Sequence, residues 1–193
     1  AFDPISLEYV ASLNPVCLKW PSGELTNHPL LRQARATGLP IMLSTGMGSM
    51  YEIAAAMDLM GPEAEVIILQ CVSNYPARIE DQNLRVLPVM QAAFGCPVGF
   101  SDHTIGPYAA LAAKALGMAV LEKHFTLDKS MAGPDHLASL EPQELLSYVQ
   151  SIRAIEVAMG NGIKQPQACE WDTRLAARQS LIVTVDKKQG ERW

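Results

Sequence analysis

One repeated unit dominates the chain: a short apolar run, then a polar cluster, then an amphipathic stretch. The apolar runs occupy residues 16–20, 40–44, 65–71, 97–101 and 118–125 of the 193 residues. Each run is short and consecutively apolar, as in a strand that is buried on both faces. Their starts lie about 21 to 32 residues apart, the spacing of successive βα units. Strands that alternate with helices in this way form a parallel sheet with the helices outside it.

This pattern alone does not separate two architectures. A (β/α)₈ barrel and a doubly wound open sheet both alternate strands with helices. Only five strands are visible, whereas a full barrel needs eight. The repeat therefore predicts an α/β fold with a parallel sheet and leaves both arrangements open.

Helix signals fill the intervals between the predicted strands. Asn27 and Pro29 begin a helix that Gly38 ends, and Ser49 with Glu52 forms a capping box. The remaining predicted helices run from Ser49 to Gly61, from about Glu80 to Phe94, from Pro107 to Gly117, and from Pro142 to about Met159 with Leu145, Val149, Ile152 and Ile155 along one face. After Gly160 the pattern breaks into a linker, followed by one further β-like run within residues 178–191.

Composition excludes several classes of protein. The chain is 49% hydrophobic and 18% charged, with a net charge of −5 and without a basic run, so nucleic acid is not an expected partner. Its apolar runs are shorter than the ~18 residues of a membrane helix, and its N-terminus lacks the pattern of a signal peptide. Four widely spaced cysteines predict neither a disulfide scaffold nor a zinc knuckle. We therefore expect a cytoplasmic protein that does not bind membranes.

Polar side chains follow all five predicted strands. In order, these are Lys19 with Ser22 to Glu24, Ser44 to Met47, Ser73 to Pro76, Ser101 to Thr104, and Glu122 to His124. In a parallel α/β fold all of these positions lie at the carboxyl edge of the sheet, where the active sites of such proteins are built. The set therefore predicts one active site.

Two of these side chains could bind a metal ion. His103 and His124 end successive strands, and neighbouring strands lie only about 4.8 Å apart. Two imidazoles placed in this way suit Mn, Fe, Co or Zn better than Ca or Mg. Structural hydrogen bonds are the alternative for either histidine. A further polar pair, Asp135 and His136, lies in a Gly- and Pro-containing loop that a simple turn would also explain.

Other residues could bind an anion. Ser22, Ser44 and Ser101 follow three different strands, where hydroxyl groups and helix N-termini can hold a phosphate or carboxylate beside Lys19. The alternative for each serine is a helix N-cap. Glu24 is a candidate acid–base group or hydroxyl ligand, and a surface ion pair is its alternative. These residues alone indicate an α/β enzyme that binds an anion and could also bind a metal ion, and they do not identify the reaction.

The same residues carry a resemblance to a known family. The segments KWPSGELTNHPLL, PIMLSTGM, QCVSNYPARIEDQNLR, VGFSDHTIG and VLEKHFTLDKSMAGPDHLASLEP occur in this order. Together they resemble the successive motifs of the sialic-acid synthases, a family that includes legionaminic and pseudaminic acid synthases. The resemblance extends from Phe2 to about Glu191 and is most specific between Gly99 and Pro142.

The resemblance implies a (β/α)₈ TIM barrel, a divalent metal that is typically Mn²⁺, and a homodimer. It also implies a reaction in which carbon 3 of phosphoenolpyruvate attacks the aldehyde of an open-chain N-acetylated amino sugar. Water then adds at carbon 2, and phosphate leaves by C–O cleavage to give a nine-carbon 2-keto sugar acid. The family's metal ligands match His103 and His124, its phosphoenolpyruvate contacts match Lys19, Ser22, Ser44 and Ser101, and its sugar contacts match Glu24, Ser73, Tyr75 and Asp135. On this basis Glu24, Lys19 and the two histidines are the predicted catalytic residues.

The chain also departs from the family. Strands 4 to 8 of the barrel are recognisable, whereas strands 1 to 3, with a catalytic glutamate, a lysine and a threonine, are not. We therefore expect a partial catalytic barrel over residues 1–160, a linker over 161–175, and over 176–193 the start of the family's C-terminal antifreeze-like domain, cut short. Trp20 and Pro21 replace the small residues that usually precede the Ser-Gly-Glu motif. We do not expect activity from these 193 residues alone.

Two other functions compete with this prediction. One is a related synthase that makes a 3-deoxy-2-keto sugar acid from a phosphorylated aldose, although such an enzyme would need more basic residues for the second phosphate. The other is a truncated, inactive paralogue that binds sugar or metal or assembles with a partner. The identity of the amino sugar is left open.

Overall fold

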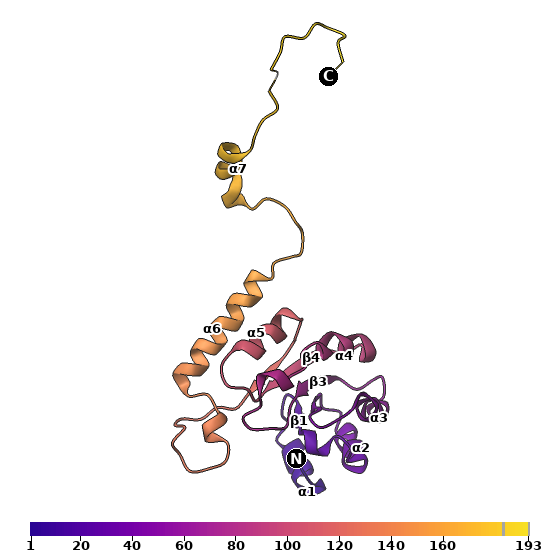
Figure 1. The fold of residues 1–193 in the computed structure, drawn as a ribbon. Coiled ribbons are helices and arrows are strands. Elements are labelled where there is room, and N and C mark those ends of the chain that lie inside the picture. Colours follow the sequence, from indigo (N-terminus) through magenta and orange to yellow (C-terminus); the bar gives the residue numbers. More distant parts are fainter. Residues whose placement is uncertain (183, 193) are drawn as a thin grey trace. The chain divides into compact units, whose positions relative to one another are not determined.

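The computed structural model describes residues 1–182 and 184–192, which fall into two compact units, residues 1–159 and residues 160–193. The first unit contains one parallel sheet (Figure 1). Its strands are β1 (Leu18–Trp20), β2 (Ile41–Ser44), β3 (Val66–Cys71), β4 (Val98–Asp102) and β5 (Leu121–Lys123). All five predicted strands are thereby confirmed.

The order of the strands in the sheet decides between the two architectures. Each strand pairs in parallel with the next one in the chain, in the order β1-β2-β3-β4-β5. In a doubly wound sheet the order in which strands are added reverses at a switch point, whereas here each new strand is added on the same side of the sheet. The winding is that of a barrel.

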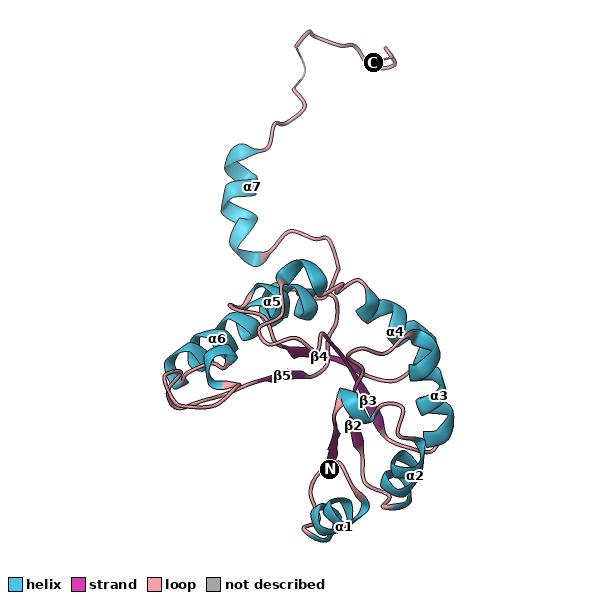
Figure 2. Ribbon diagram, turned by 60° about the horizontal axis from the view of Figure 1, so that its bottom comes forward, coloured by secondary structure: helices cyan, strands magenta, loops and turns pink. Residues whose placement is uncertain are grey.

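The sheet is also strongly curved. Lys19 on β1 and Glu122 on β5 belong to the two outer strands, yet Nζ and Oε2 lie 3.5 Å apart. In a flat sheet four strand spacings of about 4.8 Å would separate β1 from β5 by roughly 19 Å. Figure 2 shows the strands along a curved line with the helices outside it. The first unit is therefore a curled, five-stranded half-barrel.

Six helices cover the outer face of this half-barrel. They are α1 (Pro4–Ser12), α2 (His28–Ala36), α3 (Met50–Met60), α4 (Val86–Phe94), α5 (Tyr108–Ala115) and α6 (Pro142–Ala158). Short 3₁₀ turns lie at Ser22–Glu24, Ile79–Asp81 and His136–Ala138. The predicted caps are present, since Asn27 Oδ1 accepts from the Leu30 N–H and Ser49 forms a capping box with Glu52.

Two details of the predicted helices are wrong. The helix expected from Glu80 begins only at Val86, because Asn83 adopts a left-handed conformation (φ 45°) that an α-helix does not accept. On α6, Val149 is 44% exposed, and Tyr148 is the buried residue at 4% exposure. A tyrosine can be buried there because its hydroxyl finds a partner in the carboxylate of Asp102.

The hydrophobic core lies between the outer face of the sheet and the helices. Alternate strand residues point into it, including Leu18, Trp20, Ile41, Leu43, Val66, Ile68, Val98 and Phe100. Trp20 is fully buried, and its indole N–H donates to the Glu24 carbonyl oxygen at 3.0 Å. Because side chains alternate along a strand, the intervening residues face the concave side. The functional residues of the strands are found on that side.

The second unit holds a 3₁₀ turn at Ala168–Glu170 and α7 (Trp171–Ala177). The segment 161–175 predicted as a linker thus contains regular structure. The predicted β-like run includes position 183, which lies outside the described residues, and residues 178–182 and 184–192 are in no strand. Among the described residues, helices that are both long and apolar enough to cross a membrane do not occur.

Candidate active site

Eight of the ten predicted site residues line one cavity of about 300 Å³ at the carboxyl edge of the sheet. These residues are Lys19, Ser22, Ser44, Ser73, Tyr75, Ser101, His103 and His124. They come from all five strands or from the loops directly after them. The curvature of the sheet brings together residues far apart in the sequence: Lys19 and His124 are separated by 105 positions and line the same cavity.

A chain of polar contacts crosses the cavity. Lys19 Nζ donates to Ser44 Oγ at 2.8 Å and lies 3.5 Å from Glu122 Oε2. The other carboxylate oxygen of Glu122 accepts from Ser101 Oγ at 2.8 Å. Of the residues predicted to bind an anion, Lys19 and Ser101 therefore contact one carboxylate, and Ser44 is linked to it through Lys19.

Gly46 packs closely behind one wall of the cavity, against Ser22, Cys71 and Ser73. Its N–H donates to Ser22 Oγ at 3.0 Å. A Cβ added at this position would lie 2.3 Å from Ser73 Oγ and 2.8 Å from Cys71 Sγ, well inside van der Waals contact. A larger residue would displace these side chains, so the wall requires glycine.

The two predicted metal ligands lie beside each other. The ring centroids of His103 and His124 are 5.4 Å apart at an interplanar angle of 74°. His103 Nδ1 lies 2.7 Å from the Val72 carbonyl oxygen and must donate to it, which leaves Nε2 as the acceptor nitrogen, 3.3 Å from Ser101 Oγ. Burial lowers the pKa of His103, so the ring is neutral at pH 7.

These two imidazoles suit a divalent transition metal. A ligating histidine commonly donates its other ring N–H to a carbonyl group, as His103 does. Within residues 1–182 and 184–192, no group of three or more His, Cys, Asp or Glu side chains surrounds a possible ion. A metal held here would take two ligands from the chain and the others from water or substrate.

Tyr75 packs against both histidine rings. Its ring centroid lies 4.2 Å from that of His103 and 5.3 Å from that of His124. Burial raises the pKa of Tyr75, and the negative charges of Cys71, Asp135 and Glu122 raise it further. The phenol therefore stays protonated and can donate a hydrogen bond into the cavity.

Glu24 and Asp135 lie differently from the other predicted residues. Glu24 Oε2 accepts from Asn27 Nδ2 at 2.6 Å, so the carboxylate contacts the start of α2. Asp135 is exposed in the loop between β5 and α6, close enough to Tyr75 to affect its pKa. Its neighbour His136 contacts Thr126 Oγ1 through Nδ1. The sugar-side roles of Glu24 and Asp135 stay predictions.

Glu122 is the residue that the predicted site omits. Its position at the end of β5 was visible in the sequence. Two signals could have selected it: the alternation of a strand places Glu122 and His124 on the same face, and the paired position on β4 is Ser101. The contact with Lys19 depends on the curvature of the sheet and could not be read from spacing.

Fold and site together define a class of protein: an α/β half-barrel with a cavity lined by a lysine and serines and with a histidine pair at its carboxyl edge. Comparison with known proteins identifies the family. A profile of the NeuB family matches residues 1–164, and the chain belongs to this family of sialic-acid synthases.

Individual relatives agree with this assignment. The chain is 41% identical over 195 residues to N,N'-diacetyllegionaminic acid synthase of Legionella pneumophila, covering 98% of this chain and 55% of that protein. It is 38% identical over 190 residues to human N-acetylneuraminate-9-phosphate synthase, covering 97% of this chain and 53% of the relative. The chain thus spans about half the length of these relatives.

A solved structure matches the fold as well. The crystal structure of the N-acetylneuraminic acid (sialic acid) synthetase of Leptospira borgpetersenii, in complex with citrate, superimposes with a TM-score of 0.83 at 33% identity. The match covers 93% of this chain and 64% of that one. The half-barrel described above is therefore shared with a sialic-acid synthetase.

Proposed function

We propose that this chain supplies the phosphoenolpyruvate-binding and histidine-bearing part of a synthase that condenses phosphoenolpyruvate with an open-chain N-acetylated amino sugar. The products are a nine-carbon 2-keto sugar acid and phosphate. One observation carries the proposal: Lys19 and Ser101 contact a single carboxylate, that of Glu122, and Ser44 accepts a hydrogen bond from Lys19. The same groups can bind the carboxylate or phosphate of a substrate.

The anion site has a defined chemistry. A lysine next to two hydroxyl groups offers charge-assisted hydrogen bonds, which are stronger than neutral ones. Glu122 holds Lys19 and Ser101 in place before the substrate arrives, and the arriving anion shares or replaces these contacts. Ser22, fixed by the Gly46 N–H, adds a third hydroxyl on the wall of the cavity.

A divalent metal, Mn²⁺ in the first instance, fits beside this anion site. His103 and His124 would hold it, and the donor set of two imidazoles suits that class of ion. When bound, such an ion polarises a carbonyl oxygen as a Lewis acid. The Val72 carbonyl oxygen fixes the His103 ring in the tautomer in which Nε2 carries the lone pair.

The acceptor sugar would meet the cavity near Tyr75. The phenol O–H can donate to a hydroxyl or acetamido oxygen, and Ser73 adds a second hydroxyl group on the same loop. Glu24 and Asp135 are proposed to contact the sugar from the rim. The relatives are named for different products, legionaminic acid and N-acetylneuraminate 9-phosphate, so the acceptor class is proposed as N-acetylated amino sugars in general.

The related 3-deoxy-2-keto sugar acid synthases are less well supported. A phosphorylated aldose brings a second phosphate, which requires further cations. Among the described residues that line the cavity, Lys19 is the single lysine or arginine. The inactive-paralogue alternative predicts binding without turnover and is decided by experiment. A homodimer and a cytoplasmic location complete the proposal.

Phosphoenolpyruvate labelled with ¹⁸O at the bridging oxygen tests the reaction. The chain, alone and together with an N-terminal fragment that supplies strands 1 to 3 of the family barrel, is incubated with Mn²⁺, labelled phosphoenolpyruvate and either N-acetylmannosamine or a 2,4-diacetamido sugar, and the products are analysed by mass spectrometry. The proposal expects the complemented chain to form a nine-carbon keto acid and phosphate that carries the label, because the C–O bond breaks. Label left on pyruvate would mean hydrolysis at phosphorus. Binding of phosphoenolpyruvate without any product from the complemented chain would favour the inactive paralogue.

A further inference from the structure

A buried ion pair lies behind the site, on the helix-facing side of the sheet. Lys123 Nζ on β5 is 3.3 Å from Asp102 Oδ2 on β4, and their side chains are 4% and 0% exposed. The two residues are direct partners in the register of the two strands. This ion pair therefore joins β4 to β5 through their side chains as well as through their backbones.

The neighbours of the pair are the site residues. Asp102 lies between Ser101 and His103, and Lys123 lies between Glu122 and His124. Because side chains alternate across a strand, the pair faces α6 while its four neighbours face the cavity. Any change in the relative position of Asp102 and Lys123 therefore moves both histidines.

The carboxylate of Asp102 is fully occupied. Oδ1 accepts from the N–H and the hydroxyl of Thr104 at 2.8 and 2.7 Å. Oδ2 accepts from Tyr148 O–H at 2.6 Å in addition to the lysine. Lys123 Nζ also donates to the Thr104 carbonyl oxygen. The burial of Tyr148 and the nearby Asp102 charge raise its pKa, so its hydroxyl remains a donor.

Stability alone does not explain a buried ion pair at this position. The preceding residues on the same face of the two strands, Phe100 and Leu121, are apolar and pack in the core. Replacing a buried ion pair by apolar residues is often neutral or stabilising, whereas fixing a register is the best-attested role of such pairs. A slip of β5 by one residue against β4 would turn His124 away from the cavity and from His103.

We propose that Asp102, Lys123 and Tyr148 are positioning residues that hold His103 and His124 at the separation required to bind one metal ion. The inference rests on the proposed metal role of the two histidines. Tyr148 extends the arrangement to α6, so the long helix fixes the ends of both site-bearing strands.

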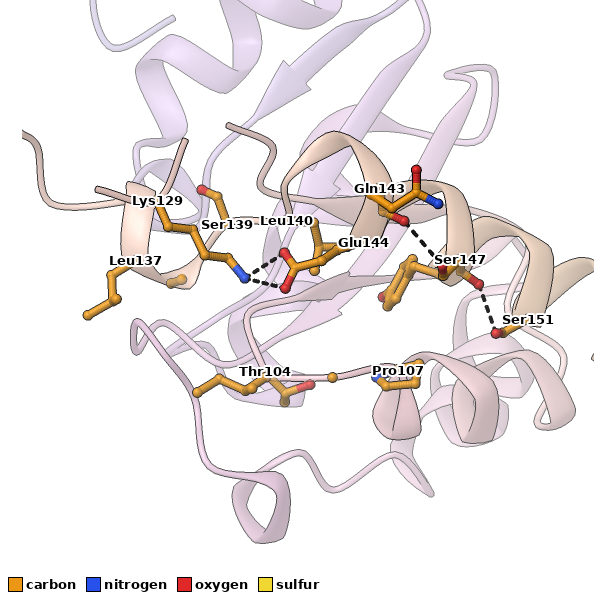
Figure 3. Close-up of a pocket in the computed structure, with 14 residues that line it drawn as sticks. Thr104, Pro107, Lys129, Leu137, Ser139, Leu140, Gln143, Glu144, Ser147 and Ser151 are labelled. Carbon is orange, nitrogen blue, oxygen red and sulfur yellow. Dashed lines mark hydrogen bonds and ion pairs between the residues drawn. The ribbon is translucent and has the colours of Figure 1, made fainter. Parts of the chain in front are cut away.

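The surroundings of Tyr148 make it a suitable residue for a test. Figure 3 shows a cavity between the start of α6 and the segment from Thr104 to Pro107, with a volume of about 610 Å³. Tyr148 lines this cavity together with Ser147, whose hydroxyl donates to the Gln143 carbonyl oxygen on α6 itself. Substitution of Tyr148 by Phe removes one hydroxyl and its hydrogen bond to Asp102 and does not add volume.

The test uses four variants: Tyr148→Phe, the neutral double variant Asp102→Asn with Lys123→Met, and two controls. Lys114→Met removes an ion pair between α5 and α6 that does not touch the sheet, and Ser147→Ala changes the neighbour of Tyr148. Mn²⁺ binding is measured by water-proton relaxation. The imidazole ¹⁵N shifts and ring-to-ring NOEs of His103 and His124 are recorded without metal.

The proposal expects Tyr148→Phe to weaken Mn²⁺ binding about tenfold, the lower end of the effect of outer-sphere partners. The histidine signals should shift in both test variants and remain unchanged in the controls. Wild-type binding and unchanged histidine signals in a folded Tyr148→Phe or double variant would overturn the inference. Failure of the unsubstituted chain to bind Mn²⁺ would refute the proposed metal role, while the metal-free spectra would still decide on the positioning role.

Discussion

Gly99 on β4 offers a quantitative test of the curled sheet. A Cβ added there would lie 2.5 Å from Leu69 Cδ2 on β3 and 2.5 Å from the Val120 carbonyl oxygen, on either side of the strand. Ordinary contacts begin near 3.4 Å, so each neighbour would have to move by about 0.9 Å. A leucine methyl group can rotate away, but the backbone oxygen can move only if the segment leading into β5 moves with it.

The cost follows from this geometry. Overpacking a core position destabilises by about 1–3 kcal/mol, and contact with a backbone atom places Gly99→Ala at the upper end. Loss of chain entropy in the unfolded state returns about 0.4–1 kcal/mol for a Gly→Ala substitution. The net expectation is a loss of about 2 kcal/mol in the free energy of unfolding.

Urea unfolding followed by circular dichroism measures this loss. Gly23→Ala is the matched control, because a Cβ at Gly23 meets nothing within 4 Å. The control should be neutral or slightly stabilised. A free energy of unfolding of Gly99→Ala within about 0.5 kcal/mol of that of the unsubstituted chain would contradict the prediction. It would mean that β3, β4 and the start of β5 do not pack around Gly99 as described.

Three further predictions concern the site and its supports. Lys19→Met should weaken phosphoenolpyruvate binding at least tenfold in calorimetry, because a charge-assisted hydrogen bond contributes about 1.5–3 kcal/mol; unchanged affinity would place the substrate elsewhere. Tyr148→Phe should lower the free energy of unfolding by about 1.5–3 kcal/mol, since it removes a hydrogen bond to the buried Asp102 carboxylate; a smaller loss in urea unfolding would contradict that contact. Hydrogen bonds from Lys114 and then Arg153 lower the pKa of Glu156 to about 2. Its contribution to stability is therefore present above about pH 4.5 and lost as the pH falls towards 2, and Glu156→Gln should flatten the unfolding profile over that window.

The sequence predicts the strands and the edge of the site well for a physical reason. Strands buried on both faces are consecutive apolar runs, and the polar residue after each run is visible as a break in that run. Parallel strands then bring these breaks to one edge without any knowledge of their side-chain contacts. The eight residues that line the cavity follow from this rule together with the family resemblance.

What the sequence does not predict depends on three-dimensional contacts. The turn at Asn83 interrupts a stretch whose apolar spacing is helical, because a left-handed residue is a local exception to that spacing. Tyr148 is buried in preference to Val149 because a partner 46 positions away, Asp102, satisfies its hydroxyl. The contact between Lys19 and Glu122 requires the sheet to curl until its two outer strands face each other.

The alternation of side chains along β4 and β5 ties these observations together. On the cavity side the two strand ends carry Ser101 and Glu122, which are paired in register and hydrogen-bonded. On the helix side the next pair in the same register is Asp102 with Lys123. Because side chains alternate between the two faces of a strand, the same strand ends can line the cavity on one face and form the buried ion pair on the other. It follows that the polar residues between Ser101 and Thr104 cannot be treated as one cluster: substitutions facing the cavity should change ligand binding first, whereas substitutions facing α6 should change stability and ligand binding together.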